Sequence, residues 1–182
     1  VLSWASPPTA PAPTGPAPIQ ETAAPKAPSC EYPRFHGVEP YKFFSKALQR
    51  DICSAIIYPD FTQPVPPEGY PLLVLLHGIH GAPSDWFRTP RFHERVAAVR
   101  EKMGFPNAYI VAPMGINGYW SDSLDGKGPW RTMVVEDLMI ELSNAKQFPN
   151  ISRNPKLRAI SGYSMGGFGA LSIAIEQPGL FG

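Results

Sequence analysis

The sequence predicts an α/β fold in which a doubly wound, mostly parallel sheet has helices between its strands. Short apolar segments alternate with segments of helical periodicity along most of the chain, as in strand–helix–strand units with right-handed crossovers. Residues 72–76 (LLVLL) are a continuous apolar run, which is typical of a central strand covered on both faces. Another apolar run ends in Ile160, and Gly-Tyr-Ser-Met-Gly follows at residues 162–166. This pattern indicates a sharp strand-to-helix turn.

The first 29 residues differ in composition from the rest of the chain. The 182 residues include 23 prolines, well above average usage, and much of the excess precedes residue 29. A segment without hydrophobic periodicity cannot bury enough apolar surface to fold, so residues 1–29 are predicted to be a disordered or semi-stiff linker. Residues 1–5 fit the end of a signal peptide. Residues 30–182 are predicted to be the N-terminal part of one domain.

The two ends of the sequence and its charge give further expectations. The chain begins at Val1 without a methionine and stops at Gly182 without a tail, so we expect part of a longer protein. The possible end of a signal peptide at residues 1–5 favours a secreted or periplasmic location. The formal net charge of +1 gives no reason to expect binding to nucleic acid or to anionic membranes. No apolar run is long enough to span a bilayer.

Cys30 and Cys53 are the only cysteines. In an exported protein, a disulfide between them would join the end of the linker to an early strand and stabilise the fold by about 3 kcal/mol. Alternatively, Cys53 is a buried core thiol and Cys30 is free. The sequence leaves both alternatives open.

Hydrophobic periodicity and capping residues predict the remaining elements. Along residues 51–58, even-numbered side chains share one face of a strand and odd-numbered ones share the other. Thr89 and Pro90 suit the first turn of a helix that ends at Gly104. Apolar residues at helical spacing between 135 and 142 indicate a second helix. The expected strands span residues 37–45, 51–58, 72–76, 108–112 and 156–161, and the third helix follows Ser164.

Ser164 is the candidate nucleophile. The turn brings the residues two before and two after it close together, and glycines at 162 and 166 remove the β-carbons that would collide. The N–H of Met165 would lie at the positive end of the new helix, where it can hold an oxyanion. The alternative is a glycine-rich turn in which Ser164 is an ordinary helix cap.

A second loop, residues 77–81 (HGIHG), follows the apolar strand 72–76. The carboxyl ends of parallel strands lie at one edge of a sheet, so this loop is expected to meet Ser164. The N–H of Ile79 is the candidate second oxyanion donor, and His80 could line the site. His77 is expected to be structural. All four histidines precede Ser164, whereas the acid and histidine should follow the serine.

The loop around residues 118–123 (GYWSDS) offers two weaker signals. Trp120 is a candidate platform for a sugar or aryl group, with simple packing over the sheet as the alternative. Asp122 and Asp125 lie near glycines but lack the full spacing of a calcium loop, so a solvated turn is favoured. Glu176, the only acid after Ser164, is not expected to orient the catalytic base.

The run from Gly37 onward resembles the esterase D-type family of α/β-hydrolases, which includes feruloyl and acetyl xylan esterases, S-formylglutathione hydrolases and mycolyltransferases. The resemblance implies the α/β-hydrolase fold, here ending after the nucleophile helix. It also implies Ser164 as nucleophile, Ile79 and Met165 at the oxyanion hole, and no metal or cofactor. The matching segments are FSKAL at 44–48, YPLLVLLHG at 70–78, DWF at 85–87, EDL at 136–138, GYSMGG at 162–167 and QPGLFG at 177–182.

These observations predict a serine carboxylic-ester hydrolase acting on a small-molecule or carbohydrate ester through an acyl-serine intermediate. The alternatives are an acyltransferase of the mycolyltransferase type and a catalytically inactive binding module. Because the acid and histidine are expected beyond Gly182, the 182-residue chain is predicted to be inactive. It is also predicted to be poorly soluble, with its last strand left as an exposed edge.

Overall fold

The structure is a computed structural model that describes residue 30, residues 37–88, residues 98 and 102, and residues 106–182. The predicted linker over residues 1–29 and most of the helix predicted between Thr89 and Gly104 lie outside the described residues.

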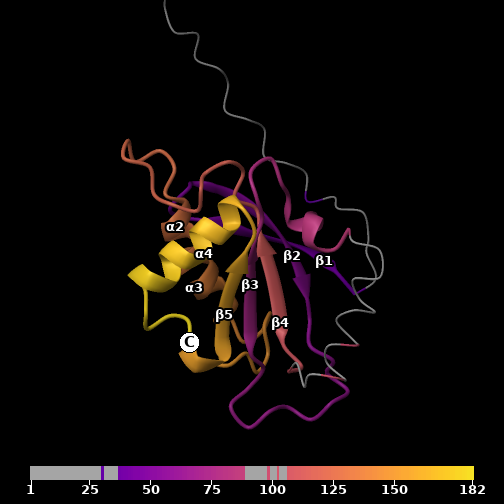
Figure 1. Cartoon of the computed structure of the whole chain (residues 1–182). Helices are drawn as coiled ribbons and strands as arrows, with labels where there is room; N and C mark the ends of the chain where they lie inside the picture. Colours follow the sequence, from indigo (N-terminus) through magenta and orange to yellow (C-terminus); the bar gives the residue numbers. More distant parts are fainter. Residues whose placement is uncertain (1–29, 31–36, 89–97, 99–101, 103–105) are drawn as a thin grey trace, which may run out of the picture.

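A five-stranded sheet in the order β1-β2-β4-β3-β5 forms the centre of the described chain (Figure 1). Strand β3 lies between β4 and β5 and is parallel to both, whereas β1 and β2 run antiparallel at one side. The predicted α/β sheet is therefore confirmed, and predicted strand ends differ from observed ones by no more than two residues. The strands are β1 (Glu39–Ser45), β2 (Arg50–Ile57), β3 (Leu72–Leu76), β4 (Tyr109–Pro113) and β5 (Arg158–Gly162).

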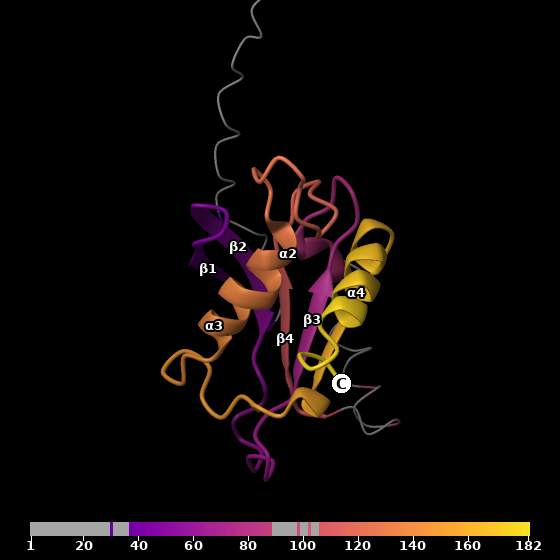
Figure 2. The ribbon, with the colours of Figure 1, turned by 90° about the vertical axis from the view of Figure 1, so that its left-hand side faces the viewer.

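The helical segments over residues 130–142 and 165–176 cover one face of this sheet and lie in front of the strands in Figure 2. The short segment over residues 83–86 packs on the opposite face through Trp86. The predicted second helix is a run of three consecutive segments whose middle part has π-helical geometry. The helical segments are η1 (Pro83–Trp86), α2 (Trp130–Thr132), η2 (Met133–Leu138), α3 (Met139–Leu142), η3 (Pro155–Leu157) and α4 (Met165–Glu176).

Strand β2 shows how the sheet separates two apolar clusters. Ile52 and Ile56 are buried in the cluster beneath the helices, and Ala55 and Ile57 belong to the cluster on the opposite face. The alternation predicted for this strand is thus confirmed. The central strands contribute to both clusters, because Val74 faces the helices and Leu75 faces away from them.

Asp137, in the π-helical segment, organises the turn between β1 and β2. Its Oδ2 accepts hydrogen bonds from the hydroxyl of Ser45 at 2.5 Å and from the N–H of Ala47 at 2.9 Å. Ser45 is fully buried, and its hydroxyl also accepts a bond from the N–H of Leu48 at 3.0 Å. Removing the carboxylate would leave two donors without their partner.

We predict that Asp137→Ala lowers the free energy of unfolding by about 2–3 kcal/mol, the usual cost of unsatisfied buried donors. Urea denaturation measures this. Glu136→Ala is the matched control, because Glu136 is the exposed neighbour on the same helical turn and should change stability by less than about 0.5 kcal/mol. Equal effects of the two variants would contradict the role given to Asp137.

Cys30 and Cys53, which are 23 positions apart in the sequence, form a disulfide with their Cα atoms 5.4 Å apart. Of the two alternatives left open by the sequence, the structure therefore supports the bonded pair. Cys53 lies in β2, which is paired on both sides by β1 and β4. The bond thus joins the start of the described chain to an interior strand.

Reduction of this disulfide is predicted to lower the free energy of unfolding by about 3 kcal/mol, because the unfolded chain regains the freedom of a closed loop. The measurement is urea denaturation with and without a thiol reductant. Cys30→Ser should be as unstable as the reduced protein and should not respond to reductant. A wild-type denaturation midpoint that is the same in both buffers would contradict the prediction.

One face of α4 is apolar and exposed. Phe168, Leu171 and Ile175 are each more than half exposed and recur at helical spacing, and the neighbouring β5 is an edge strand. Exposed apolar patches and open strand edges favour association, so the poor solubility expected of these 182 residues stays a prediction. Among the described residues, no helix is long and apolar enough to cross a membrane.

Candidate active site

Ser164 lies at the turn between β5 and α4 with φ 53° and ψ −122°. A serine rarely adopts positive φ, and such strain is found mainly at functional sites. Its side chain is exposed. Within the described chain, that side chain makes no capping hydrogen bond to the helix it precedes. This geometry fits the predicted nucleophile turn and disfavours the alternative of an ordinary helix cap.

The glycines on either side of the serine are required by close backbone contacts. A β-carbon on Gly162 would lie 2.2 Å from the carbonyl carbon and oxygen of Gly166. A β-carbon on Gly166 would lie 1.9 Å from the carbonyl oxygen of Leu76, at the end of β3. The contact predicted between the two glycines is present, and a second contact joins the start of α4 to the neighbouring strand.

We predict that Gly166→Ala destabilises the protein by about 3 kcal/mol or more, because backbone atoms would have to move. Thermal unfolding followed by circular dichroism tests this. Gly167→Ala is the control: its added β-carbon meets nothing closer than 3.4 Å, and alanine in a helix is favoured by about 0.5–1 kcal/mol. Equal melting temperatures of the two variants would show that the contact between Gly166 and the Leu76 carbonyl oxygen does not constrain the turn.

The loop after β3 meets the serine turn, as the sequence predicted. A β-carbon on Gly78 would lie 3.4 Å from Cβ of Ser164 and 2.7 Å from the ring of Tyr163. Ile79 follows directly and is 45% exposed. Met165 is the first residue of α4, so its N–H has no partner within the helix. The pairing of the Ile79 and Met165 amides around one oxyanion stays a prediction.

His77 is completely buried beneath this loop. Its Nδ1 lies 2.7 Å from the carbonyl oxygen of Gly78, and its Nε2 accepts a hydrogen bond from the N–H of Gly115 at 2.9 Å. Burial lowers the pKa of the ring, although the Gly78 carbonyl and Asp85 act in the opposite direction. A neutral ring with both nitrogens engaged suits the structural role predicted for His77.

His80 lies at the outer end of the same loop and is exposed. Its N–H donates to Oδ1 of Asn117 at 2.8 Å, and its Nδ1 lies 3.2 Å from Nδ2 of the same side chain. Asn117 thereby joins residues 77–81 to the loop that follows β4. Nothing in the sequence pointed to Asn117, because its partner is 37 positions away.

The expectation that Trp120 offers a platform to substrate is corrected by its position. The side chain is fully buried, and its indole N–H donates to the carbonyl oxygen of His77 at 3.1 Å. A β-carbon on Gly169 of α4 would lie 2.3 Å from the Trp120 Cβ. The tryptophan therefore packs beneath the site. Tyr119, which is half exposed and lies in edge contact with Phe168, is the aromatic side chain at the surface.

Asp122 holds the start of the helical segment that begins at Trp130. Its carboxylate accepts hydrogen bonds from the N–H and hydroxyl of Thr132, both at 2.9 Å, and pairs with Arg131. Burial raises the pKa of Asp122, but these bonds and the Arg131 charge together lower it below its usual value. Arg131 also pairs with Glu176 at the end of α4. Glu176 is thus paired with Arg131 and not with a group at the serine turn. Among the described residues, no group of three or more potential metal ligands occurs.

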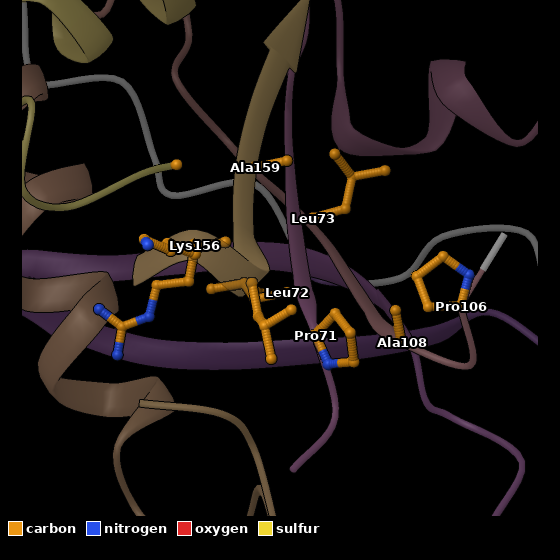
Figure 3. A pocket seen from close by; sticks show the side chains of 10 residues that line it. Pro71, Leu72, Leu73, Pro106, Ala108, Lys156 and Ala159 are labelled. Carbon is orange, nitrogen blue, oxygen red and sulfur yellow. The ribbon is translucent and has the colours of Figure 1, made fainter. Parts of the chain in front are cut away.

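A pocket of about 260 Å³ lies at the amino ends of β3 and β5 (Figure 3), whereas Ser164 follows the carboxyl end of β5. The pocket is lined by residues that include Leu72, Lys156 and Arg158. Burial lowers the pKa of Arg158, whose guanidinium lies 3.5 Å from the carbonyl oxygen of Ser152. The pocket contains none of the predicted site residues, so the candidate active site is the serine turn.

The sequence profile of the Esterase family matches residues 45–182, more than half of the chain. No curated protein matched. Among solved structures, a ferulic acid esterase has a TM-score of 0.67 and 23% identity, with 79% of this chain and 56% of that chain covered. The ferulic acid esterase from Anaeromyces mucronatus in complex with ferulic acid has a TM-score of 0.64 and 16% identity, with 80% and 55% covered. The S-formylglutathione hydrolase from Agrobacterium tumefaciens has a TM-score of 0.60 and 18% identity, with 79% and 55% covered.

The chain spans a little over half the length of these three structures. Because their sequence identities to this chain are 23% or lower, these structures support only the fold. The profile match supports the family. Both agree with the resemblance found in the sequence. The chain has the α/β-hydrolase fold and belongs to the Esterase family.

Proposed function

We propose that this protein is a serine carboxylic-ester hydrolase whose nucleophile is Ser164. The observation that carries the proposal is the backbone of Ser164, held at positive φ between two glycines that admit no β-carbon. This conformation lowers the stability of the fold, but it also places the Ser164 hydroxyl at the surface, where a substrate can reach it. The contact between Gly78 and Ser164 supports a site formed by two loops.

In the proposed reaction, the Ser164 hydroxyl attacks the ester carbonyl carbon while a general base removes its proton. The carbonyl oxygen becomes an oxyanion held by the N–H groups of Ile79 and Met165. The protonated base gives its proton to the leaving alcohol. Water, deprotonated by the same base, then attacks the acyl-serine, and the acid is released as the serine oxygen regains a proton. His77 cannot act as the base, because its buried ring is engaged at both nitrogens.

The base and its orienting acid are proposed to follow Ser164 in the chain, in the order found in α/β-hydrolases. The 182 residues alone are therefore proposed to be inactive. The substrate is proposed to be an acyl or aryl ester of a carbohydrate. Exposed apolar side chains on the two loops, on the first turns of α4 and beside them support a hydrophobic acyl group, namely Ile79, Tyr163, Phe168 and its edge-on neighbour Tyr119. Export to a secreted or periplasmic location is proposed because disulfides persist in oxidising compartments.

We predict that Ser164→Ala, made in the complete reading frame, lowers kcat/KM for p-nitrophenyl acetate by about 10⁴-fold or more, the usual result of removing a nucleophile. Ser172→Ala is the matched control, because it changes another serine on the adjoining helix and should retain activity. Turnover by Ser164→Ala at the wild-type rate would remove Ser164 from the mechanism.

Two rival functions give different outcomes in the same assay. An acyltransferase would also lose activity with Ser164→Ala, but the wild type would pass the acyl group to an added sugar hydroxyl rather than to water. A catalytically inactive binding module would show no turnover in the wild type. Product analysis with and without a sugar acceptor therefore separates all three.

A further inference from the structure

We infer that His77 is a positioning residue of the oxyanion hole, and that its ring holds the Gly78–Ile79 peptide so that the Ile79 N–H faces the space above Ser164. The inference rests on the proposed function, because the direction of this N–H matters only if an oxyanion forms at Ser164.

The first step concerns the geometry of one peptide group. The carbonyl of Gly78 and the N–H of Ile79 belong to the same planar trans peptide, so they point in opposite directions. The Gly78 oxygen lies 2.7 Å from Nδ1 of His77 and accepts a bond from the N–H of Gly81 at 3.0 Å. Two donors thus fix the direction of the carbonyl, and with it the direction of the Ile79 N–H.

The second step assigns the proton on the ring. The N–H of Gly115 points at Nε2 of His77 from 2.9 Å, so Nε2 must accept. A neutral imidazole that accepts at one nitrogen carries its proton on the other, and Nδ1–H therefore donates to the Gly78 oxygen. One neutral tautomer satisfies both contacts. Burial of the ring favours this uncharged form.

The third step is the support that holds the ring in place. Trp120 contacts it edge-on with ring centroids 5.1 Å apart and donates its indole N–H to the His77 carbonyl oxygen at 3.1 Å. Trp120 in turn packs against Gly169 of α4. The peptide with the proposed oxyanion donor and the helix that begins after Ser164 are thus positioned by one buried pair of side chains.

The test compares His77→Leu, which removes the donor, with His77→Asn, which restores an N–H near the position of Nδ1. In the complete protein, His77→Leu should lower kcat by about 10- to 100-fold, because a misdirected donor loses most of its effect. KM should stay within about twofold, since the ground-state ester uses the hole little. A trifluoromethyl ketone, which forms a tetrahedral oxyanion on the serine, should bind more weakly by a similar factor. His77→Asn should recover part of both losses.

Leu142→Ala controls for stability, because Leu142 is a buried core residue of α3 and its truncation should lower the melting temperature without changing kcat. Wild-type kcat and inhibitor affinity in both His77 variants would overturn the inference while leaving Ser164 as nucleophile. If the proposed function itself is wrong, Ser164→Ala should instead keep full activity.

A measurement on the unmodified protein keeps the inference testable if the variants do not fold. Nitrogen-15 NMR of the histidine rings at neutral pH should show one neutral ring protonated at Nδ1. A His77 ring that is charged or protonated at Nε2 would contradict the assignment.

Discussion

The constraint on which the rest of the site depends is the contact between α4 and the end of β3, where Gly166 leaves no room for a β-carbon against the Leu76 carbonyl oxygen. This contact presses the first turn of the helix onto the central strand. The serine before the helix must then adopt positive φ to connect β5 to it. The residues after Leu76 begin the neighbouring loop, so one packing contact determines where both halves of the proposed site lie.

Much of the fold followed from local patterns. The ends of β3 were predicted without error, because a run of five apolar residues between Pro71 and His77 is too short for a helix and fits a buried strand. The faces of β2 followed from strict alternation. The π-helical geometry of Met133–Leu138 was not predicted, because helical spacing in the sequence does not distinguish it from an α-helix. The hydrogen bonds of Asp137 in this segment also left no local signal, because its partners are about 90 positions away.

The geometry of the serine turn was predicted because it is encoded within a few neighbouring residues, Gly162, Ser164 and Gly166. For Trp120 the sequence left a substrate platform and simple packing both open, because an aromatic residue in a glycine-rich loop has the same sequence signal whether its ring faces substrate or the core. Burial decides between these cases, and it comes from Gly115 and Gly169, whose missing side chains make space for the indole. The hydrogen bond from Gly115 to His77 likewise spans 38 positions, beyond the reach of any local pattern.

The disulfide has a mechanical consequence. If the Pro/Ala-rich segment before Cys30 connects this domain to another body, tension in it enters the domain at residue 30. The covalent bond passes that load directly to Cys53 in β2, a strand hydrogen-bonded on both sides. The edge strand β1 is bypassed and is not peeled from the sheet one hydrogen bond at a time. A tethered domain of this design would resist pulling through the hydrogen bonds of β2 to both of its neighbours. The serine turn follows β5, at the other side of the sheet from the loaded strand.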